Sequence, residues 1–351
     1  MFESFSLFLV KRLYNKMKFI HEKNQYEGKC INIKSPFLSF PKSIFNIFIN
    51  RSSYSLWILQ FKIIIFALLL FSRIETVCKE NYMAVAKLII KRSVFSFISI
   101  YVWGIMPGRT QRWISRIYAD LYNKNWSKKL IKPYCKAHYK DPNYLDQFVP
   151  ASGAETYKNF QDFFTRLWKV PPTIETNHVW ACEGLLCEYG KIDELNLVRV
   201  KGQKRHLRTI FGDAGKDIPE DYFFSNVFLH NNNYHRIHAP INGEITRIEH
   251  IPGDLVLLRP WAYKNPSLPA LRNERINVDI KDNHGRTWYL SIVGGPGVGA
   301  IVLGGETTIG SSVEIGNEIA TFLLGSTCCI ASPEPVTNNK VGDQVFMGDP
   351  I

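Results

Sequence analysis

Residues 238–258, HAPINGEITRIEHIPGDLVLL, and residues 275–295, RINVDIKDNHGRTWYLSIVGG, alternate short apolar runs with turn sequences. Runs of the same kind, rich in Val, Ile and Leu, continue through the chain after Asn177. The turns are marked by Asn242-Gly243, Pro252-Gly253-Asp254, Asn283-His284-Gly285 and Gly342-Asp343. Many short strands, about 8–12 residues apart, are typical of antiparallel sandwiches and barrels. We therefore expect a mainly antiparallel β domain, barrel-like or sandwich-like, in the second half of the chain.

Helical patterns precede this β region. In residues 109–126, RTQRWISRIYADLYNKNW, the residues Trp113, Ile117 and Leu121 recur at helical spacing beside three arginines. This predicts an amphipathic helix that either packs on the core or rests on anionic lipid. Residues 156–166, TYKNFQDFFTR, predict a second, short helix. The fold class that follows is α+β, with a helical segment in front of the β domain.

Composition and charge narrow the classes of function. The 351 residues are 46% hydrophobic and 21% charged, which excludes a disordered chain and allows a sizeable core. The net charge of +12 is unevenly placed, because residues 1–150 carry +16 and residues 151–351 carry −4. The basic residues lie among apolar runs, and no nucleic-acid-binding motif accompanies them. An anionic membrane is therefore favoured over nucleic acid as the partner.

The N-terminal region has the composition of a targeting segment followed by an anchor. Residues 1–54 are basic and contain only three acids, as mitochondrial transit peptides do. Residues 55–72, SLWILQFKIIIFALLLFS, form an 18-residue apolar run that is marginal for a bilayer span and contains Lys62. It is either a single span or a buried or interfacial helix. Residues 83–106 mix Lys and Arg with apolar residues and predict an interfacial helix. We expect a membrane anchor or interfacial helices over residues 55–106.

The seven cysteines contain no CxxC pair and no zinc-finger spacing, so free thiols are expected. His235 and His238 are three residues apart, a spacing that suits metal binding only on a helix. Here they enter a predicted strand, and no metal site is expected.

Three short segments carry residues that are able to do chemistry. Gly325-Ser326 closes an apolar run, and its serine hydroxyl is a potential nucleophile if a base is near. His235 and His238 are suited to act as base and proton donor. Glu183 lies in Ala181-Cys182-Glu183-Gly184, at a turn before a predicted strand. Taken singly, each segment is also compatible with a purely structural turn or strand end.

Taken in order, these segments resemble the phosphatidylserine decarboxylase proenzyme family, of the pyruvoyl-dependent type. The likeness covers roughly residues 109–351 and excludes the first hundred. The matching segments are Phe163-Phe164-Thr165-Arg166, Ala181-Cys182-Glu183-Gly184, Gly190-Lys191-Ile192, Val200-Lys201-Gly202, Tyr234-His235-Arg236-Ile237-His238-Ala239-Pro240, Pro252-Gly253-Asp254-Leu255, Arg272-Asn273-Glu274-Arg275, Val293-Gly294, Val298-Gly299 and Leu324-Gly325-Ser326-Thr327. Each is weak alone, but six or more in the right order are a strong signal.

The resemblance implies a chain that cleaves itself between Gly325 and Ser326 into a β chain and an α chain of residues 326–351. Ser326 is then the nucleophile of self-cleavage and becomes a covalent pyruvoyl cofactor, which forms a Schiff base with the substrate. His238 is implied as the base of self-cleavage, and His235 as the proton donor in decarboxylation. Glu183 is implied as the acid that orients His238. The resemblance also implies phosphatidylserine as the substrate, phosphatidylethanolamine as the product, and a heterodimer of the two chains, with further oligomerisation possible.

One departure from the family is visible. The acid that orients the histidine is usually Asp, whereas Glu183 is one methylene longer. Glu occurs in such triads on other folds. The acids Asp162 and Asp193 lie at other offsets and are not candidates. An alternative is therefore an unprocessed, inactive homologue that binds lipid.

A second likeness concerns carrier domains. Residues 238–245 with Pro252-Gly253-Asp254 resemble lipoate- and biotin-bearing domains, but the swinging Lys on a hairpin is missing. We therefore expect residues 107–351 to form the catalytic domain of a carboxy-lyase. We place it at the mitochondrial inner membrane, with the endomembrane system as the alternative location.

Overall fold

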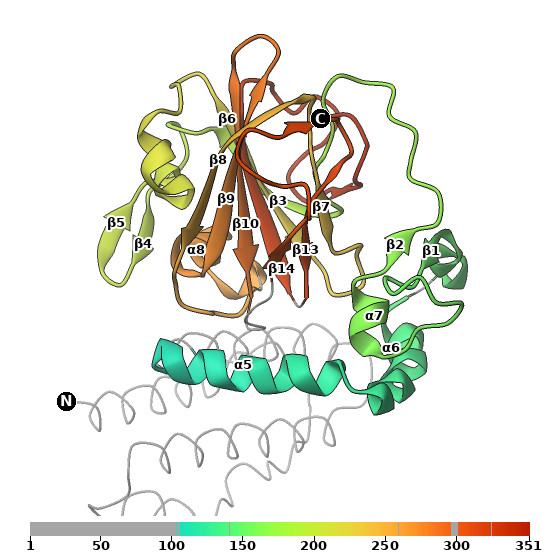
Figure 1. Ribbon diagram of the computed structural model, residues 1–351. Coiled ribbons are helices and arrows are strands. Elements are labelled where there is room, and N and C mark those ends of the chain that lie inside the picture. The colour runs from blue at the N-terminus through green and yellow to red at the C-terminus, as the bar shows by residue number, and fades with distance from the viewer. Residues whose placement is uncertain (1–102, 104–105, 140, 259, 296–300, 324) are drawn as a thin grey trace, which may run out of the picture. The chain divides into compact units, whose positions relative to one another are not determined.

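The computed structural model describes residues 103, 106–139, 141–258, 260–295, 301–323 and 325–351 (Figure 1). All of them belong to the second of two compact units, which runs from residue 62 to residue 351. The expected targeting segment lies outside the described residues, and so does the expected anchor except for Trp103 and Met106. Within the described ranges, no helix is both long enough and apolar enough to cross a bilayer.

Most of the helices precede the β domain along the chain, as the sequence predicts. The helix expected over residues 109–126 is observed as α5 (Gly108–Tyr122), and the one expected over residues 156–166 is the shorter α7 (Phe160–Phe164). Asn159 begins α7, because its side chain accepts a hydrogen bond from the Asp162 amide at 2.8 Å. The helices are α5 (Gly108–Tyr122), α6 (Ile131–His138), α7 (Phe160–Phe164) and α8 (Leu268–Arg272), with 3₁₀ helices η2 (Asn125–Leu130), η3 (Pro142–Gln147), η4 (Leu207–Lys216) and η5 (Pro260–Ala262).

The strands are short and pair antiparallel, which confirms the α+β class. They are β1 (Phe148–Val149), β2 (Leu167–Trp168), β3 (Gly184–Lys191), β4 (Val198–Val200), β5 (Gln203–Arg205), β6 (Phe223–Leu229), β7 (Arg236–His238), β8 (Gly243–Ile251), β9 (Arg275–Asp282), β10 (Thr287–Gly294), β11 (Ile301–Leu303), β12 (Ser312–Val313), β13 (Glu318–Phe322), β14 (Ser326–Ser332) and β15 (Gln344–Val345).

The main sheet is open, and this corrects the expectation of a barrel. Its eight strands follow the order β12-β8-β9-β10-β14-β6-β3-β15 within the described residues. The two edge strands are only two residues long, and they pair with β8 and β3 and not with each other. Because barrel closure requires the edges to pair, the sheet cannot close. The predicted turn at residues 283–285 does join β9 to β10, where Gly285 has a φ of +82°.

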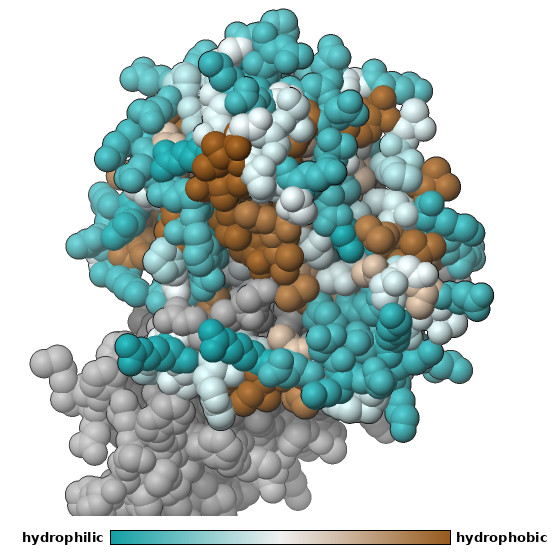
Figure 2. Space-filling view, viewed as in Figure 1, coloured by the Kyte–Doolittle hydropathy of each residue, from teal (hydrophilic) through white to brown (hydrophobic). Residues whose placement is uncertain are grey.

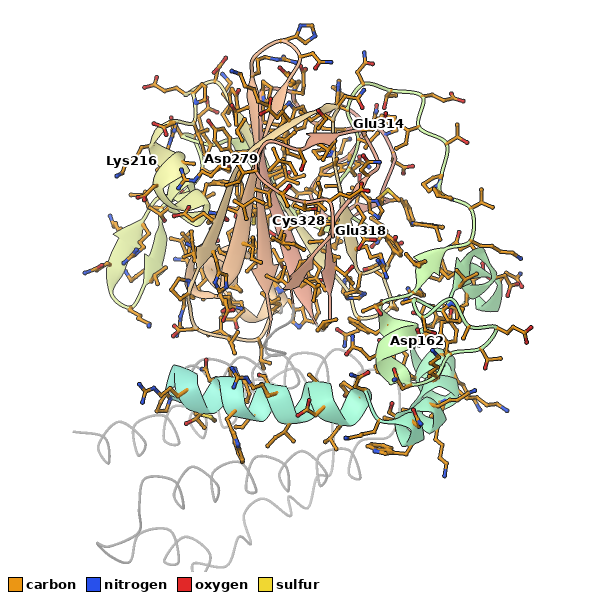
Figure 3. All side chains as sticks on the ribbon, viewed as in Figure 1. Asp162, Lys216, Asp279, Glu314, Glu318 and Cys328 are labelled. Carbon is orange, nitrogen blue, oxygen red and sulfur yellow. The ribbon has the colours of Figure 1, made fainter. Side chains whose placement is uncertain are left out.

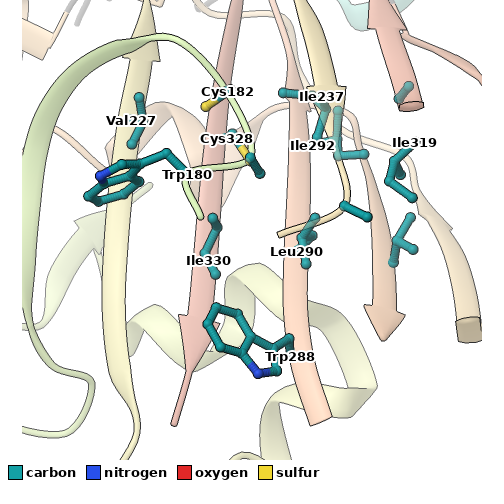
Figure 4. Packing of buried hydrophobic residues seen from close by; sticks show 14 of the residues in the cluster. Trp180, Cys182, Val227, Ile237, Trp288, Leu290, Ile292, Ile319, Cys328 and Ile330 are labelled. Atoms are coloured by element: carbon teal, nitrogen blue, oxygen red, sulfur yellow. The ribbon is translucent and has the colours of Figure 1, made fainter. Parts of the chain in front are cut away.

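A smaller sheet, β11-β13-β7, lies against one face of the main sheet. The core between them contains Trp180, Ile237, Phe322 and Cys328, and Figure 4 shows Cys182 beside Cys328 in this layer. On the other face of the main sheet, η4 and α8 cover a second core that includes Phe211, Leu271 and Cys329. Successive residues of β14 therefore point to opposite cores, so Ser326 shares a face with Cys328.

Candidate active site

The Gly325–Ser326 junction lies where the chain passes from the small sheet to the main sheet. It follows β13 and begins β14, the strands on which Figure 3 labels Glu318 and Cys328. Gly325 has a φ of +36°, a left-handed conformation that favours a residue without Cβ. Ser326 is fully buried, and its Oγ has no hydrogen-bond partner among the described residues. A buried hydroxyl without a partner is unfavourable and often marks a functional position.

A second connection runs alongside this junction. It leads from β6 to β7 and contains Asn233 and His235. Ser326 pairs with Leu229 at the end of β6, and the Phe322 amide donates to the His235 carbonyl at 2.9 Å. Both connections therefore cross between the same two sheets at the same end. This brings the loop that carries His235 next to the Gly325–Ser326 junction.

His235 is fully buried and neutral. Its ring centroid lies 3.9 Å from that of Phe164, and its Nδ1 donates to the Asn233 carbonyl at 2.8 Å. Because a carbonyl only accepts, the proton is assigned to Nδ1 and Nε2 is unprotonated. Nε2 has no partner among the residues that the structure describes. Burial, helped by the positive charge of Arg166, lowers the pKa of His235 to about 3.

His238 is also buried, and both of its ring nitrogens have partners. Nδ1 lies 2.7 Å from the Gly316 carbonyl, and Nε2 lies 3.0 Å from the Tyr234 hydroxyl. The same reasoning assigns the proton to Nδ1, so Nε2 accepts from Tyr234. Burial lowers the pKa of His238, which keeps the ring neutral and able to act as a base.

Glu183 is buried, and two side chains donate hydrogen bonds to its carboxylate. The Tyr144 hydroxyl lies 2.8 and 2.7 Å from its two carboxylate oxygens, and the Asn233 amide donates to Oε1 at 2.6 Å. Burial raises the pKa of Glu183, and these two donors partly oppose the rise. The carboxylate thus contacts the loop that bears the histidines.

The expected direct contact between Glu183 and His238 is not among the contacts of the described residues, because Gly316 and Tyr234 occupy the imidazole nitrogens. Its orienting role therefore stays a prediction and must act through the loop. The other two acids are held elsewhere. Asp162 accepts from the Ser152 amide at 2.8 Å, and Asp193 is paired with Arg208.

Sequence reasoning missed the residues that organise these groups. Tyr144 and Asn233 bind Glu183 but lie 39 and 50 residues from it along the chain, so no local pattern connects them. Tyr234 and Arg166 stand inside the quoted segments, yet nothing in their spacing indicates that they contact the histidines or their loop.

Comparison with known proteins identifies a family for this part of the chain. The family model for phosphatidylserine decarboxylase matches residues 160–351, which contain the junction, both histidines and Glu183. Phosphatidylserine decarboxylase proenzymes are similar to this chain. That of Methylobacillus flagellatus is 29% identical over 237 residues, covering 60% of this chain and 80% of the relative. That of Variovorax paradoxus is 31% identical over 202 residues, covering 51% and 70%.

The class of protein that results is an enzyme, and specifically a decarboxylase. The match extends over more than half of the chain and over most of each relative. The chain belongs to the phosphatidylserine decarboxylase family.

The expected mitochondrial location is wrong. The phosphatidylserine decarboxylase proenzymes to which this chain is similar include bacterial proteins from Methylobacillus, Dechloromonas, Shewanella and Variovorax. The same findings give no support to the endomembrane alternative, and the basic character of residues 1–54 was not a sufficient basis for either assignment.

Proposed function

We propose that the chain is a proenzyme that cleaves itself between Gly325 and Ser326 and then decarboxylates phosphatidylserine to phosphatidylethanolamine. The junction carries the proposal: a buried hydroxyl without a described partner directly follows a glycine with positive φ. The proenzyme names of the relatives support it. They give no support to the alternative of an inactive, lipid-binding homologue.

In self-cleavage, Ser326 Oγ attacks the carbonyl carbon of Gly325, the C–N bond between the residues breaks, and an ester forms. A base must take the hydroxyl proton, because a free serine is a weak nucleophile. We assign this role to His238 Nε2, with Glu183 as the supporting acid. Tyr234 donates to the same nitrogen, so it must turn away or relay the proton.

β-Elimination then releases the Gly325 carboxylate and leaves an unsaturated residue at position 326. Hydrolysis removes its nitrogen as ammonia and leaves the pyruvoyl ketone. The products are a β chain ending at Gly325 and a 26-residue α chain, 326–351, which remain together as a heterodimer.

The surroundings of Ser326 fit a pyruvoyl group, because the position is closed to solvent and lies beside the His235 loop. The group supplies an electron sink for the charge left when carbon dioxide departs. We assign proton donation to His235. Since its ring is neutral, Nε2 can deliver only a proton that it has first taken up within the site, for instance from the substrate ammonium.

The test is the intact mass of the purified protein under denaturing conditions. Wild type should give two chains, and Ser326→Ala should give one, because no hydroxyl is available to attack. Splitting of the Ala variant at this junction would refute the mechanism. His238→Ala should block cleavage, whereas His235→Ala should permit cleavage and lose decarboxylation. Equal loss of cleavage in both would remove the assignment of separate roles.

We also propose that the expected anchor, residues 55–106, and the helix α5 bring the enzyme to an anionic membrane. The support is α5, on which Trp113, Ile117 and Leu121 are exposed beside Arg109 and Arg116. Figure 2 shows both hydrophilic and apolar side chains along this helix. Deleting residues 1–82 should weaken binding to vesicles, and the remaining binding should require anionic lipid and fall with salt. Vesicle binding that depends neither on anionic lipid nor on salt would refute the proposal of a membrane-binding surface.

A further inference from the structure

Arg166 is a fully buried cation between the helical segment and the β domain. Its side chain has no exposed surface, and its Cζ lies 4.6 Å from the Phe148 ring centroid and 5.5 Å from that of Phe163. No carboxylate forms an ion pair with it among the described residues. Burying a charge in this way is costly unless hydrogen bonds compensate. Its hydrogen bonds therefore indicate what the charge does.

Those bonds go to the loop that carries His235. Arg166 Nη2 donates to the Asn232 carbonyl at 3.0 Å and to the Asn233 carbonyl at 2.8 Å. The Asn233 carbonyl is also the acceptor for His235 Nδ1. The Asn233 side chain in turn donates to Glu183. One residue, Asn233, thus connects the buried arginine to the carboxylate and to the imidazole.

The contact is reciprocal. Arg236, the first residue of β7, donates from Nε and Nη2 to the Thr165 carbonyl at 3.0 and 2.7 Å, and it forms an ion pair with Glu318. Each arginine therefore holds the backbone of the other's segment. Two such clamps leave the loop between β6 and β7 little freedom to shift.

We propose that Arg166 is a positioning residue for His235: by holding the Asn232 and Asn233 carbonyls it fixes the acceptor of His235 Nδ1, and with it the orientation and tautomer of the ring. The catalytic part of this inference rests on the proposed function, since it assumes that His235 moves a proton during decarboxylation. The structural part does not. Among the described residues, Arg166 forms no hydrogen bond to the junction or to the imidazole; its hydrogen bonds reach the ring through the Asn233 carbonyl, and its charge acts on the ring through space.

The first measurement reads the tautomer of His235 directly, from the nitrogen chemical shifts of labelled histidine in the full-length chain. The Ser326→Ala background keeps the chain intact, and His235→Asn identifies the signal. We expect one Nδ1-protonated tautomer in the unaltered loop and a mixture in Arg166→Met. The charged and titratable groups that act on this ring are Arg166 and His230. An unchanged tautomer in Arg166→Met would overturn the proposal.

The second measurement is the kinetics of the processed enzyme. Arg166→Met should lower kcat by about 100-fold, as displacement of a catalytic group by about 1 Å does, with KM changed less than about twofold. Arg166→Lys should recover part of the loss, because an ammonium can still donate to one carbonyl. A fall in kcat that Lys does not relieve, or a change confined to KM, would count against positioning.

The matched control is Arg275→Met. Arg275 is also a buried arginine that donates to backbone carbonyls, those of Ile210, Asn273 and Thr209. Its loss should lower stability without altering the His235 tautomer or kcat. If Arg166→Met does not fold, Arg166→Gln, which also removes the charge, takes its place, and wild-type tautomer and kcat there would overturn the proposal. Absence of cleavage and activity in wild type would refute the proposed function instead, and the tautomer result would still stand.

Discussion

Replacing His235 by Asn should change how the stability of the protein depends on pH. The ring is neutral in the folded chain because its pKa is lowered from 6.5 to about 3, mainly by burial. The unfolded chain takes up a proton as the pH falls below 6.5, whereas the folded chain does not. Stability present above pH 6.5 is therefore lost progressively towards pH 3. Asn keeps a donor for the Asn233 carbonyl but cannot take up that proton.

The size of the effect follows from the two pKa values. pH 5 lies about 1.5 units below the pKa of the unfolded histidine and well above that of the folded one. The protonation of His235 in the unfolded chain therefore lowers the free energy of unfolding by about 2 kcal/mol between pH 8 and pH 5. His235→Asn should lose stability at every pH, because the contact with Phe164 is removed. Between pH 8 and pH 5, however, it should lose about 2 kcal/mol less than the parent.

The assay is urea unfolding of the full-length chain in detergent at pH 8 and pH 5, in the Ser326→Ala background so that one chain unfolds. Only the difference between variant and parent at the two pH values is compared, which removes the contribution of every other group. His284→Asn, at an exposed turn, is the control and should follow the parent. An identical pH dependence for parent and His235→Asn would mean that His235 is not buried as a neutral ring.

Gly295→Ala should slow self-cleavage strongly, because its Cβ would lie 2.5 Å from the Gly325 carbonyl oxygen at the scissile bond; the half-time of chain splitting measures this. Burial raises the pKa of Asp279 from 3.8 to about 7, so its ionisation opposes folding as the pH rises. Between pH 5 and pH 8, the free energy of unfolding of Asp279→Asn, measured in urea, should therefore rise by about 3 kcal/mol relative to that of the parent. Tyr144→Phe should raise the pKa of Glu183, since a donor that lowers it is lost, and should shift the pH midpoint of chain splitting upward.

Each of these three predictions has a result that would contradict it. Gly305→Ala, where an added Cβ meets nothing within 4 Å, is the control for Gly295 and should cleave at the parental rate. A pH-independent gain for Asp279→Asn would attribute the effect to packing and not to charge. An unshifted pH profile in Tyr144→Phe would mean that the charge of Glu183 does not govern cleavage.

The strands and their turns were predictable from local sequence, and the pairing of distant strands was not. The pattern of residues 275–295 predicted the β9–β10 hairpin, because alternation and a Gly-containing turn are local features. That β14 lies between β10 and β6 depends on contacts across 100 residues. Whether the sheet closes depends on its edges, and β12 and β15 are too short to signal that they are strands.

The site shows the same division between local and distant information. The sequence segments that resemble the family indicated four residues of the site: Ser326, His235, His238 and Glu183. They did not indicate the hydrogen-bond partners of these residues. Tyr144 reaches Glu183 from a 3₁₀ helix with no motif of its own. A buried polar group takes whichever partner the fold brings near, and sequence spacing does not reveal it.

The position of β14 bears on what happens to a chain once it has been cut. This strand is interior to the eight-stranded sheet and pairs over its length with β10 on one side and β6 on the other. A break before its first residue would create a new chain end. It would not expose a hydrogen-bonded edge of the strand, because both edges are paired. The short fragment could leave only if the sheet parted into two halves, with β10 and β6 both stripped of a neighbour. Cleavage here would thus be a chemical change without a dissociation, and a synthetic peptide of the same sequence should not exchange into the folded protein.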